Sequence, residues 1–93
     1  MVDTWFMEAY WKLGTLHMDN GNWKAAMLEI GKFMLMASNM KNEPAYEQAL
    51  SYLTECAFEM KDKTLCEHFG KRTLAVNPKN DYVLDYLANL DSL

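Results

Sequence analysis

The stretch that decides the fold is WKLGTLHMDNGNWKAAM, residues 11–27. Its apolar residues recur at spacings of three and four on both sides of a polar turn, which predicts two amphipathic helices. Gly21 can adopt the left-handed conformation that commonly ends a helix, and Asn22 can cap the helix that follows. Small residues at Gly14 and Ala26 predict a close crossing, because larger side chains would push the backbones apart. The stretch therefore predicts an antiparallel helix hairpin.

Helical spacing continues along the rest of the chain. Apolar residues recur at three and four throughout, and no segment alternates in twos as a half-buried strand does. Pro44 suits the first turn of a helix, and Asn80 can cap the last helix. Asp62 and Thr64 are alternative caps for the helix that starts in the 61–64 break. The sequence therefore predicts an all-α fold whose five helices cover about residues 4–18, 23–39, 44–60, the stretch from this break to 76, and 81–90.

Composition and charge narrow the class of protein. With 93 residues, 51% of them hydrophobic, the chain is expected to form one domain with a modest core. No apolar run approaches the roughly 20 residues of a membrane span, and the N-terminus does not resemble a secretory signal, so we expect a cytoplasmic protein and no membrane partner. The net charge of -4 leaves no concentrated basic surface for nucleic acid. Cys56 and Cys66 are the only cysteines, and we expect both to be reduced and buried.

The helix pair recurs along the sequence. The positions of Leu53 and Leu87 differ by 34, and in the same register the small residues Thr54 and Ala88 match each other. The positions of Leu13 and Leu53 differ by 40, which is 34 plus an insertion of six. A helix pair that repeats at this period is typical of a helical repeat array.

Two segments carry a resemblance to a known family. Residues 10–14, the turn at 20–23 and Ala26 resemble the first tetratricopeptide signature in their order of aromatic, Leu-Gly, turn glycine, aromatic and alanine. Residues 77–80, Asn-Pro-Lys-Asn, resemble the closing segment of such a repeat. The resemblance implies antiparallel helix hairpins stacked into a right-handed superhelix. It implies one domain over residues 1–93, made of a first repeat at about 7–40, an insertion at 41–46, a second repeat at about 47–80 and a terminal helix at 81–93 that covers the second repeat.

The chain departs from the family pattern at several positions. Lys61 replaces the turn glycine of the second repeat, Lys63 replaces the aromatic residue after it, and Gly70 stands where a large core residue is usual. In the first repeat, Leu28 and Leu35 lie where a fully solvated helix face is expected. These two leucines therefore predict additional burial on that face.

The resemblance also nominates a binding surface, because in this family the first helix of each pair lines a concave groove. The same offsets give sixteen partner-binding residues: Glu8, Trp11, Lys12, Thr15, Met18, Asp19, Gln48, Ser51, Tyr52, Glu55, Phe58, Glu59, Tyr82, Asp85, Tyr86 and Asn89. This set is aromatic and acidic, with five carboxylates and one lysine. Five basic residues lie instead on the second helices: Lys24, Lys32, Lys63, Lys71 and Arg72. We therefore expect two faces of opposite potential and a partner protein or peptide that is basic or forms an amphipathic helix.

These expectations point to a non-catalytic interaction module that acts as an adaptor or chaperone, similar to the small repeat chaperones that keep secretion-system subunits soluble. No enzyme, metal site or cofactor is expected, because His17 and His68 lie far apart and Cys66 and His68 face different ways on a helix. One alternative is a homo-oligomeric scaffold, such as a homodimer, with an apolar interface made of Trp5, Phe6, Leu28 and Leu35. Another alternative is a designed or excised repeat segment without a ligand of its own.

Overall fold

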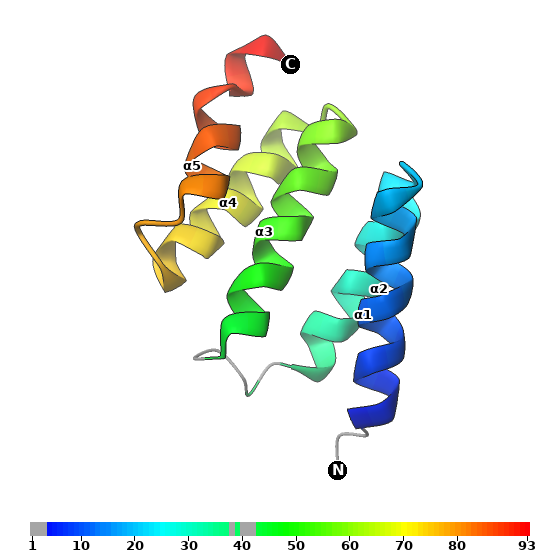
Figure 1. Ribbon diagram of the computed structural model, residues 1–93. Coiled ribbons are helices and arrows are strands. Elements are labelled where there is room, and N and C mark those ends of the chain that lie inside the picture. The colour runs from blue at the N-terminus through cyan, green and yellow to red at the C-terminus, as the bar shows by residue number, and fades with distance from the viewer. Residues whose placement is uncertain (1–3, 38, 40–42) are drawn as a thin grey trace.

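Helices account for all the regular structure of the described chain. The computed structural model describes residues 4–37, 39 and 43–93. Within these residues there is no strand, and the helices are α1 Thr4–Asp19, α2 Trp23–Met36, α3 Pro44–Glu59, α4 Lys63–Val76, α5 Asp81–Ala88 and a short 3-10 helix, η1, Leu90–Ser92. The helices form two layers, with α1, α3 and α5 in front and α2 and α4 behind them (Figure 1). The prediction of an all-α fold with five α-helices is confirmed.

The two helix hairpins have matching bounds. The helices α1 and α3 both contain 16 residues, and α2 and α4 both contain 14. The starting positions of α1 and α3 differ by 40, and so do those of α2 and α4. This offset equals the one between Leu13 and Leu53 in the sequence. The insertion expected at 41–46 falls partly on residues 41–42, which lie outside the described residues, while Pro44, Ala45 and Tyr46 belong to α3.

Both hairpin turns end the first helix with the same hydrogen bonds. In the first turn the N–H of Gly21 donates to the carbonyl oxygen of Met18 at 3.0 Å. The N–H of Asn22 donates to the carbonyl oxygen of His17 at 2.8 Å, which completes a Schellman motif. The two corresponding bonds of the second turn measure 2.9 Å each. Both turns need a left-handed residue, which is Gly21 (φ 74°) in the first and Lys61 (φ 61°) in the second, where the lysine side chain makes this conformation costly.

Two of the predicted helix caps are present and one is not. The side chain of Asp62 accepts a hydrogen bond from the N–H of Leu65 at 3.0 Å, so Asp62 and not Thr64 caps α4. The side chain of Asn80 caps α5 as predicted. The cap predicted at Asn22 is wrong, since its side chain accepts no capping bond within the described chain. Its ψ of 68° falls short of the extended conformation that the other two caps adopt.

Helix α2 is shorter than predicted. It ends at Met36 rather than near Asn39. The N–H of Ala37 still donates to the carbonyl oxygen of Phe33 at 2.8 Å, so Ala37 closes the last turn of the helix. Helical spacing of apolar residues alone does not mark this end, because Met36 is followed by a small residue that fits either a helix or a turn.

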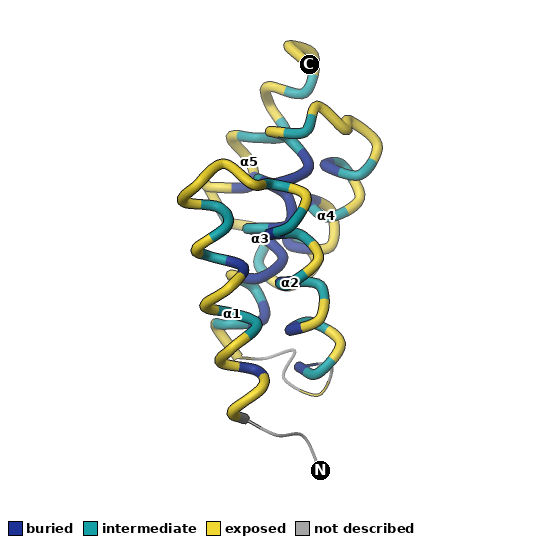
Figure 2. Tube along the Cα trace, turned by 90° about the vertical axis from the view of Figure 1, so that its right-hand side faces the viewer, coloured by how far each residue is buried: buried dark blue, intermediate teal, exposed yellow. Residues whose placement is uncertain are grey.

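The core lies between the two layers, where Figure 2 shows the buried positions. A Cβ atom on Gly14 would lie 2.5 Å from Cγ1 of the fully buried Ile30, which confirms the close crossing of α1 and α2 at this glycine. A Cβ atom on Gly70 would lie 2.7 Å from Cδ2 of Leu87. Gly70 is therefore small because α5 packs against α4 there. Cys56 and Cys66 are both free and buried, as expected.

Candidate functional site

Three neighbouring cavities formed by described residues run across the face of α1, α3 and α5. The first, of about 320 Å³, lies between α1 and the start of α3 and is lined by Met7, Glu8, Trp11, Lys12, Phe33, Ala45 and Gln48. The second, of about 450 Å³, lies between α3 and α5 and is lined by Pro44, Glu47, Gln48, Ser51, Tyr52, Asn80 and Tyr82. The third, of about 300 Å³, is lined by Thr15, Met18, Asp19, Trp23, Tyr52, Glu55 and Tyr82. Because adjacent cavities share Gln48, Tyr52 and Tyr82, they form one continuous depression, called the front groove below.

Most of the residues nominated from the sequence lie in the front groove. Eleven of the sixteen line its cavities: Glu8, Trp11, Lys12, Thr15, Met18, Asp19, Gln48, Ser51, Tyr52, Glu55 and Tyr82. The structure does not bring the other five to these cavities: Phe58, Glu59, Asp85, Tyr86 and Asn89. Two of these five pack together, with the rings of Phe58 and Tyr86 4.9 Å apart. The side chain of Asn89 donates to the carbonyl oxygen of Asp85, so it serves the end of its own helix.

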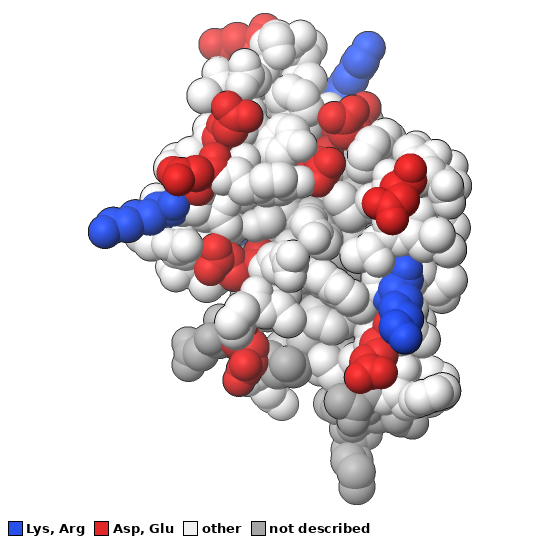
Figure 3. All heavy atoms as spheres, in the orientation of Figure 1, with Lys and Arg blue, Asp and Glu red and all other residues white. Residues whose placement is uncertain are grey.

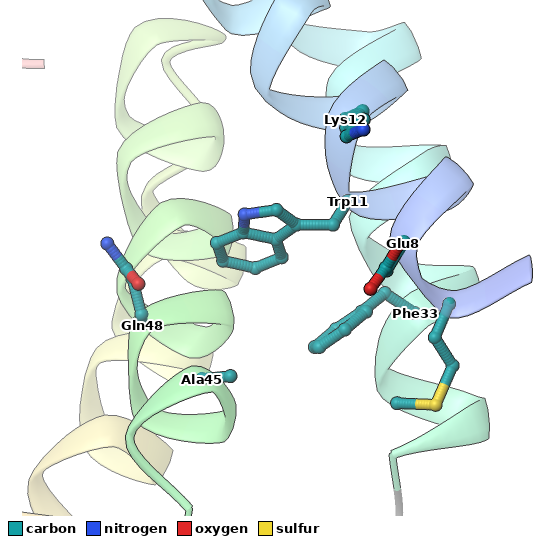
Figure 4. A pocket seen from close by; sticks show the side chains of 7 residues that line it. Glu8, Trp11, Lys12, Phe33, Ala45 and Gln48 are labelled. Carbon is teal, nitrogen blue, oxygen red and sulfur yellow. The ribbon is translucent and has the colours of Figure 1, made fainter. Parts of the chain in front are cut away.

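Aromatic side chains form the floor of the first cavity. The indole of Trp11 stacks on the ring of Tyr52, with centroids 5.4 Å apart and an interplanar angle of 23°. The indole also lies near the ring of Phe33, at 5.0 Å between centroids. The side-chain amide of Gln48 donates to the hydroxyl of Tyr52 at 2.9 Å. Figure 4 shows Trp11 pointing from α1 toward α3, with Phe33 below it and Gln48 on the facing helix. The half-buried Trp11 is thus held between both hairpins while it still lines the cavity.

Glu55 is a half-buried carboxylate of the third cavity with direct partners on α5. The hydroxyl of Tyr82 donates a hydrogen bond to its carboxylate, and the hydroxyl of Tyr86 interacts with it as well. Burial raises the pKa of the Glu55 carboxyl, the hydrogen bond from Tyr86 lowers it, and the negative charge of Glu59 raises it further. Burial, together with the charges of Glu55 and Glu59, raises the pKa of Tyr86 to about 12. A cationic group placed beside Glu55 would offset the hydration that its carboxylate has lost.

The two layers carry opposite charge. The described helices α1, α3 and α5 contain seven acidic residues and one basic residue, Lys12. Helices α2 and α4 contain five basic residues and two acidic residues, which pair with neighbouring lysines: Glu29 with Lys32 at 3.4 Å and Glu67 with Lys71 at 2.7 Å. Figure 3 shows acidic side chains distributed across the front face, over all three of its helices. This arrangement agrees with the opposite potentials expected from the sequence.

Several groove residues were missed by the repeat offsets. Phe33 and Trp23 come from α2, a second helix, which the offsets exclude. Ala45 precedes the point at which the second repeat was counted to begin. Glu47 lies in the second cavity and accepts hydrogen bonds from Asn77 at 3.0 Å and from Asn80 at 2.7 Å. The helix start predicted at Pro44 is the one signal in the sequence that could have indicated that the first turn of α3 contributes residues to the groove.

The four apolar residues nominated for an oligomer interface are all exposed and are divided between two helices. Trp5 and Phe6 lie on α1, and Trp5 lines a small cavity made only by residues of that helix. Leu35 lines a cavity between α2 and α4, next to Phe69. The additional burial predicted for Leu28 and Leu35 is not supplied by the described part of the chain.

Comparisons with known proteins add no relative: no family model matches the chain, and neither the curated proteins nor the solved structures include a match. In the described part of the chain, no three His, Cys, Asp or Glu side chains come together as a metal site requires. None of the described helices has the length and apolar character needed to cross a bilayer.

Proposed function

We propose that this chain is a cytoplasmic, non-catalytic interaction module of the tetratricopeptide type whose front groove binds an amphipathic helix with apolar and basic residues. In this proposal the two matching hairpins and α5 are two and a half stacked units of a right-handed superhelix. The module acts as an adaptor or as a chaperone that covers the apolar face of its partner. The constant offset between the hairpins and the grouping of the nominated residues in one depression support this proposal.

The observation that carries the proposal is the first cavity. Its volume of about 320 Å³ falls in the range of ligand pockets, and its walls are formed mainly by Met7, Trp11, Phe33 and Ala45. A large apolar side chain of a partner fits such a site and would act as the anchor of the interface.

The charges around the groove define the rest of the partner. Glu8 borders the first cavity, whereas Asp19 and Glu55 border the third, and Lys12 is the only base among the nominated residues. Lysine or arginine side chains that flank the apolar anchor would meet these carboxylates. An acidic helix would be repelled by the same groups.

Two synthetic peptides of equal length test this function by fluorescence anisotropy. One has leucines at helical spacing with lysines on its other face, and in the second every lysine is replaced by glutamate. We expect only the lysine peptide to bind. Absence of binding by the lysine peptide, or equal binding by both, would contradict the proposal. Binding of neither peptide is the result expected of the alternative, a repeat segment without a ligand of its own.

Two variants localise the binding. Ala45→Leu extends a larger apolar side chain into the first cavity without changing charge. We expect it to weaken binding of the lysine peptide about tenfold, which corresponds to about 1.4 kcal/mol. Glu55→Gln removes the half-buried charge of the third cavity and is expected to weaken binding by about three- to tenfold. Glu67→Gln makes the same chemical change on α4 and serves as the control, with unchanged affinity. An equal effect of Glu67→Gln would place binding outside the front groove.

A further inference from the structure

One face of α1 forms an exposed apolar stripe, made of Phe6, Ala9, Leu13 and Leu16 and called the α1 stripe below. The spacings of three, four and three place these residues on one side of the helix. The exposed fractions are 52% for Phe6, 44% for Leu13 and 55% for Leu16, and Ala9 is exposed as well. Figure 2 looks onto the end of the molecule formed by α1 and α2, where much of α1 is exposed. The buried side of α1, which includes Met7 and Gly14, lies against α2 instead.

In the second hairpin, the residues that correspond to the α1 stripe are covered by a neighbouring helix. At the offset that relates the two hairpins, the α1 stripe corresponds to four residues of α3, all of them buried: Tyr46, Ala49, Leu53 and Cys56. Ala49 and Leu53 belong to the core cluster with Ile30 and Phe33 of α2. In the described chain α1 has no helix on the corresponding side. The α1 stripe is therefore a helix-packing surface that is open in the single chain.

We propose that a second copy of this chain covers the α1 stripe, with the two α1 helices antiparallel about a two-fold axis. The stripe contains no ionisable side chain, so two copies can meet there without burying a charge. Its residues occupy positions a and d of a heptad, the pattern by which helices interlock. In the antiparallel pair, Phe6 lies opposite Leu16 of the second copy, and Ala9 lies opposite Leu13. The stripe is thus complementary to itself, with a small residue facing a large one at the centre.

The charged residues of α1 lie beside the α1 stripe and are not members of it. Glu8, Lys12 and Asp19 line the cavities of the front groove, and Glu8 and Lys12 also border the α1 stripe, since they share a small cavity with Ala9. The dimer leaves the second cavity of each front groove open, because no residue of α1 lines that cavity. Because each copy contributes one helix of 16 residues, roughly 24 Å long, the interface is small and should dissociate on dilution.

Sedimentation velocity across the micromolar concentration range tests the proposal. We expect the wild-type chain to change from monomer to dimer as concentration rises and Leu13→Lys to stay monomeric with an unchanged circular dichroism spectrum. Leu35→Lys is the matched control, since Leu35 is 80% exposed on α2, and it should dimerise like the wild type. A wild-type chain that is monomeric at every concentration would overturn the proposal. So would a dimer that survives Leu13→Lys or one that is lost in Leu35→Lys as well.

Mixing two variants tests the antiparallel pairing. Ala9→Glu and Leu13→Lys should each be monomeric alone. When mixed, they should form a heterodimer, because the introduced acid faces the introduced base and the second contact keeps its natural pair. A mixture that remains monomeric would refute this arrangement. In the control, Ala9→Glu is mixed with Leu35→Lys, which has no introduced base opposite the introduced acid, and these two variants should not form a heterodimer.

Discussion

Replacing two helical glycines by alanine should change stability in opposite directions. Gly31 lies inside α2, and apart from its chain neighbours and the backbone of its own helix, a Cβ atom there would meet no described atom within 4 Å. Alanine lowers the backbone entropy cost of glycine in a helix, so Gly31→Ala should stabilise the fold by about 0.5–1 kcal/mol. Gly14→Ala gains the same helix propensity in α1, but its surroundings decide the result.

At Gly14 the added Cβ atom would lie 2.5 Å from Cγ1 of Ile30 and 3.4 Å from its backbone nitrogen. Ile30 is fully buried, so it cannot move into solvent, and the two helices must separate instead. Overpacking of this kind costs about 1–3 kcal/mol, and we expect the upper half of this range because the contact involves an atom close to the backbone. After the gain in propensity, Gly14→Ala should lower the free energy of unfolding by about 1–2.5 kcal/mol.

Urea unfolding followed by far-ultraviolet circular dichroism measures both variants. Their free energies of unfolding should differ by about 2–3 kcal/mol, with similar m-values because the same surface is exposed. In a chain of this size each kcal/mol moves the melting temperature by about 4–8 °C. A Gly14→Ala variant as stable as the wild type would refute the close crossing of α1 and α2. A destabilised Gly31→Ala variant would refute the open position of Gly31.

Four single residues give further predictions. Lys61→Gly should raise the free energy of unfolding in urea by about 0.5–1 kcal/mol, because Lys61 has φ 61°, and an unchanged or lower value would count against the left-handed turn. Asn80→Ala should lower it by about 1–3 kcal/mol, since this residue caps α5 and donates to Glu47 at 2.7 Å, and a loss within error would contradict both roles. Burial raises the pKa of Cys56 to about 12, so Ellman's reagent should modify the thiols in urea but not in the native chain at neutral pH; rapid native labelling would disprove their burial. The pKa of Glu55 in the folded chain is raised above its ordinary 4.5, so the contribution of this carboxyl to stability is fully present below pH 4.5 and is lost as pH rises through the raised pKa. The free energy of unfolding of Glu55→Gln, relative to the wild type, should therefore increase with pH over this range. A difference between the two chains that does not change with pH would exclude the shift.

Local rules of sequence predicted the ends of most helices. Gly21, Asp62 and Asn80 work through hydrogen bonds to residues within a few positions, so their roles can be read from the chain alone. Asn22 shows the limit of this reasoning, because it follows the same kind of turn as Asp62, yet its side chain makes no capping bond at a ψ of 68°. The residue type alone does not determine that angle. The close approach at Gly14 was also predictable, since two helices of a hairpin can approach closely only where a small side chain lies between them.

Exposure along α1 could not be predicted in the same way. Leu13 and Leu53 occupy the same place in the repeated pattern, yet Leu53 is buried and Leu13 is 44% exposed. The difference comes from position in the stack, because α3 has α2 beside it and α1 is the first described helix. Similarly, Phe33 and Ala45 reach the front groove through the packing of three helices, which no single-helix offset can express.

Binding in the front groove is tested most directly by nuclear magnetic resonance of the ¹⁵N-labelled chain during titration with the leucine-lysine peptide. The indole N–H signals of Trp11 and Trp23 should shift together with the backbone signals of Gln48 and Glu55, because all four residues line the groove. Signals of α4, such as that of Lys71, should stay in place. Shifts confined to α2 and α4, or no shift at saturating peptide, would contradict binding in the front groove.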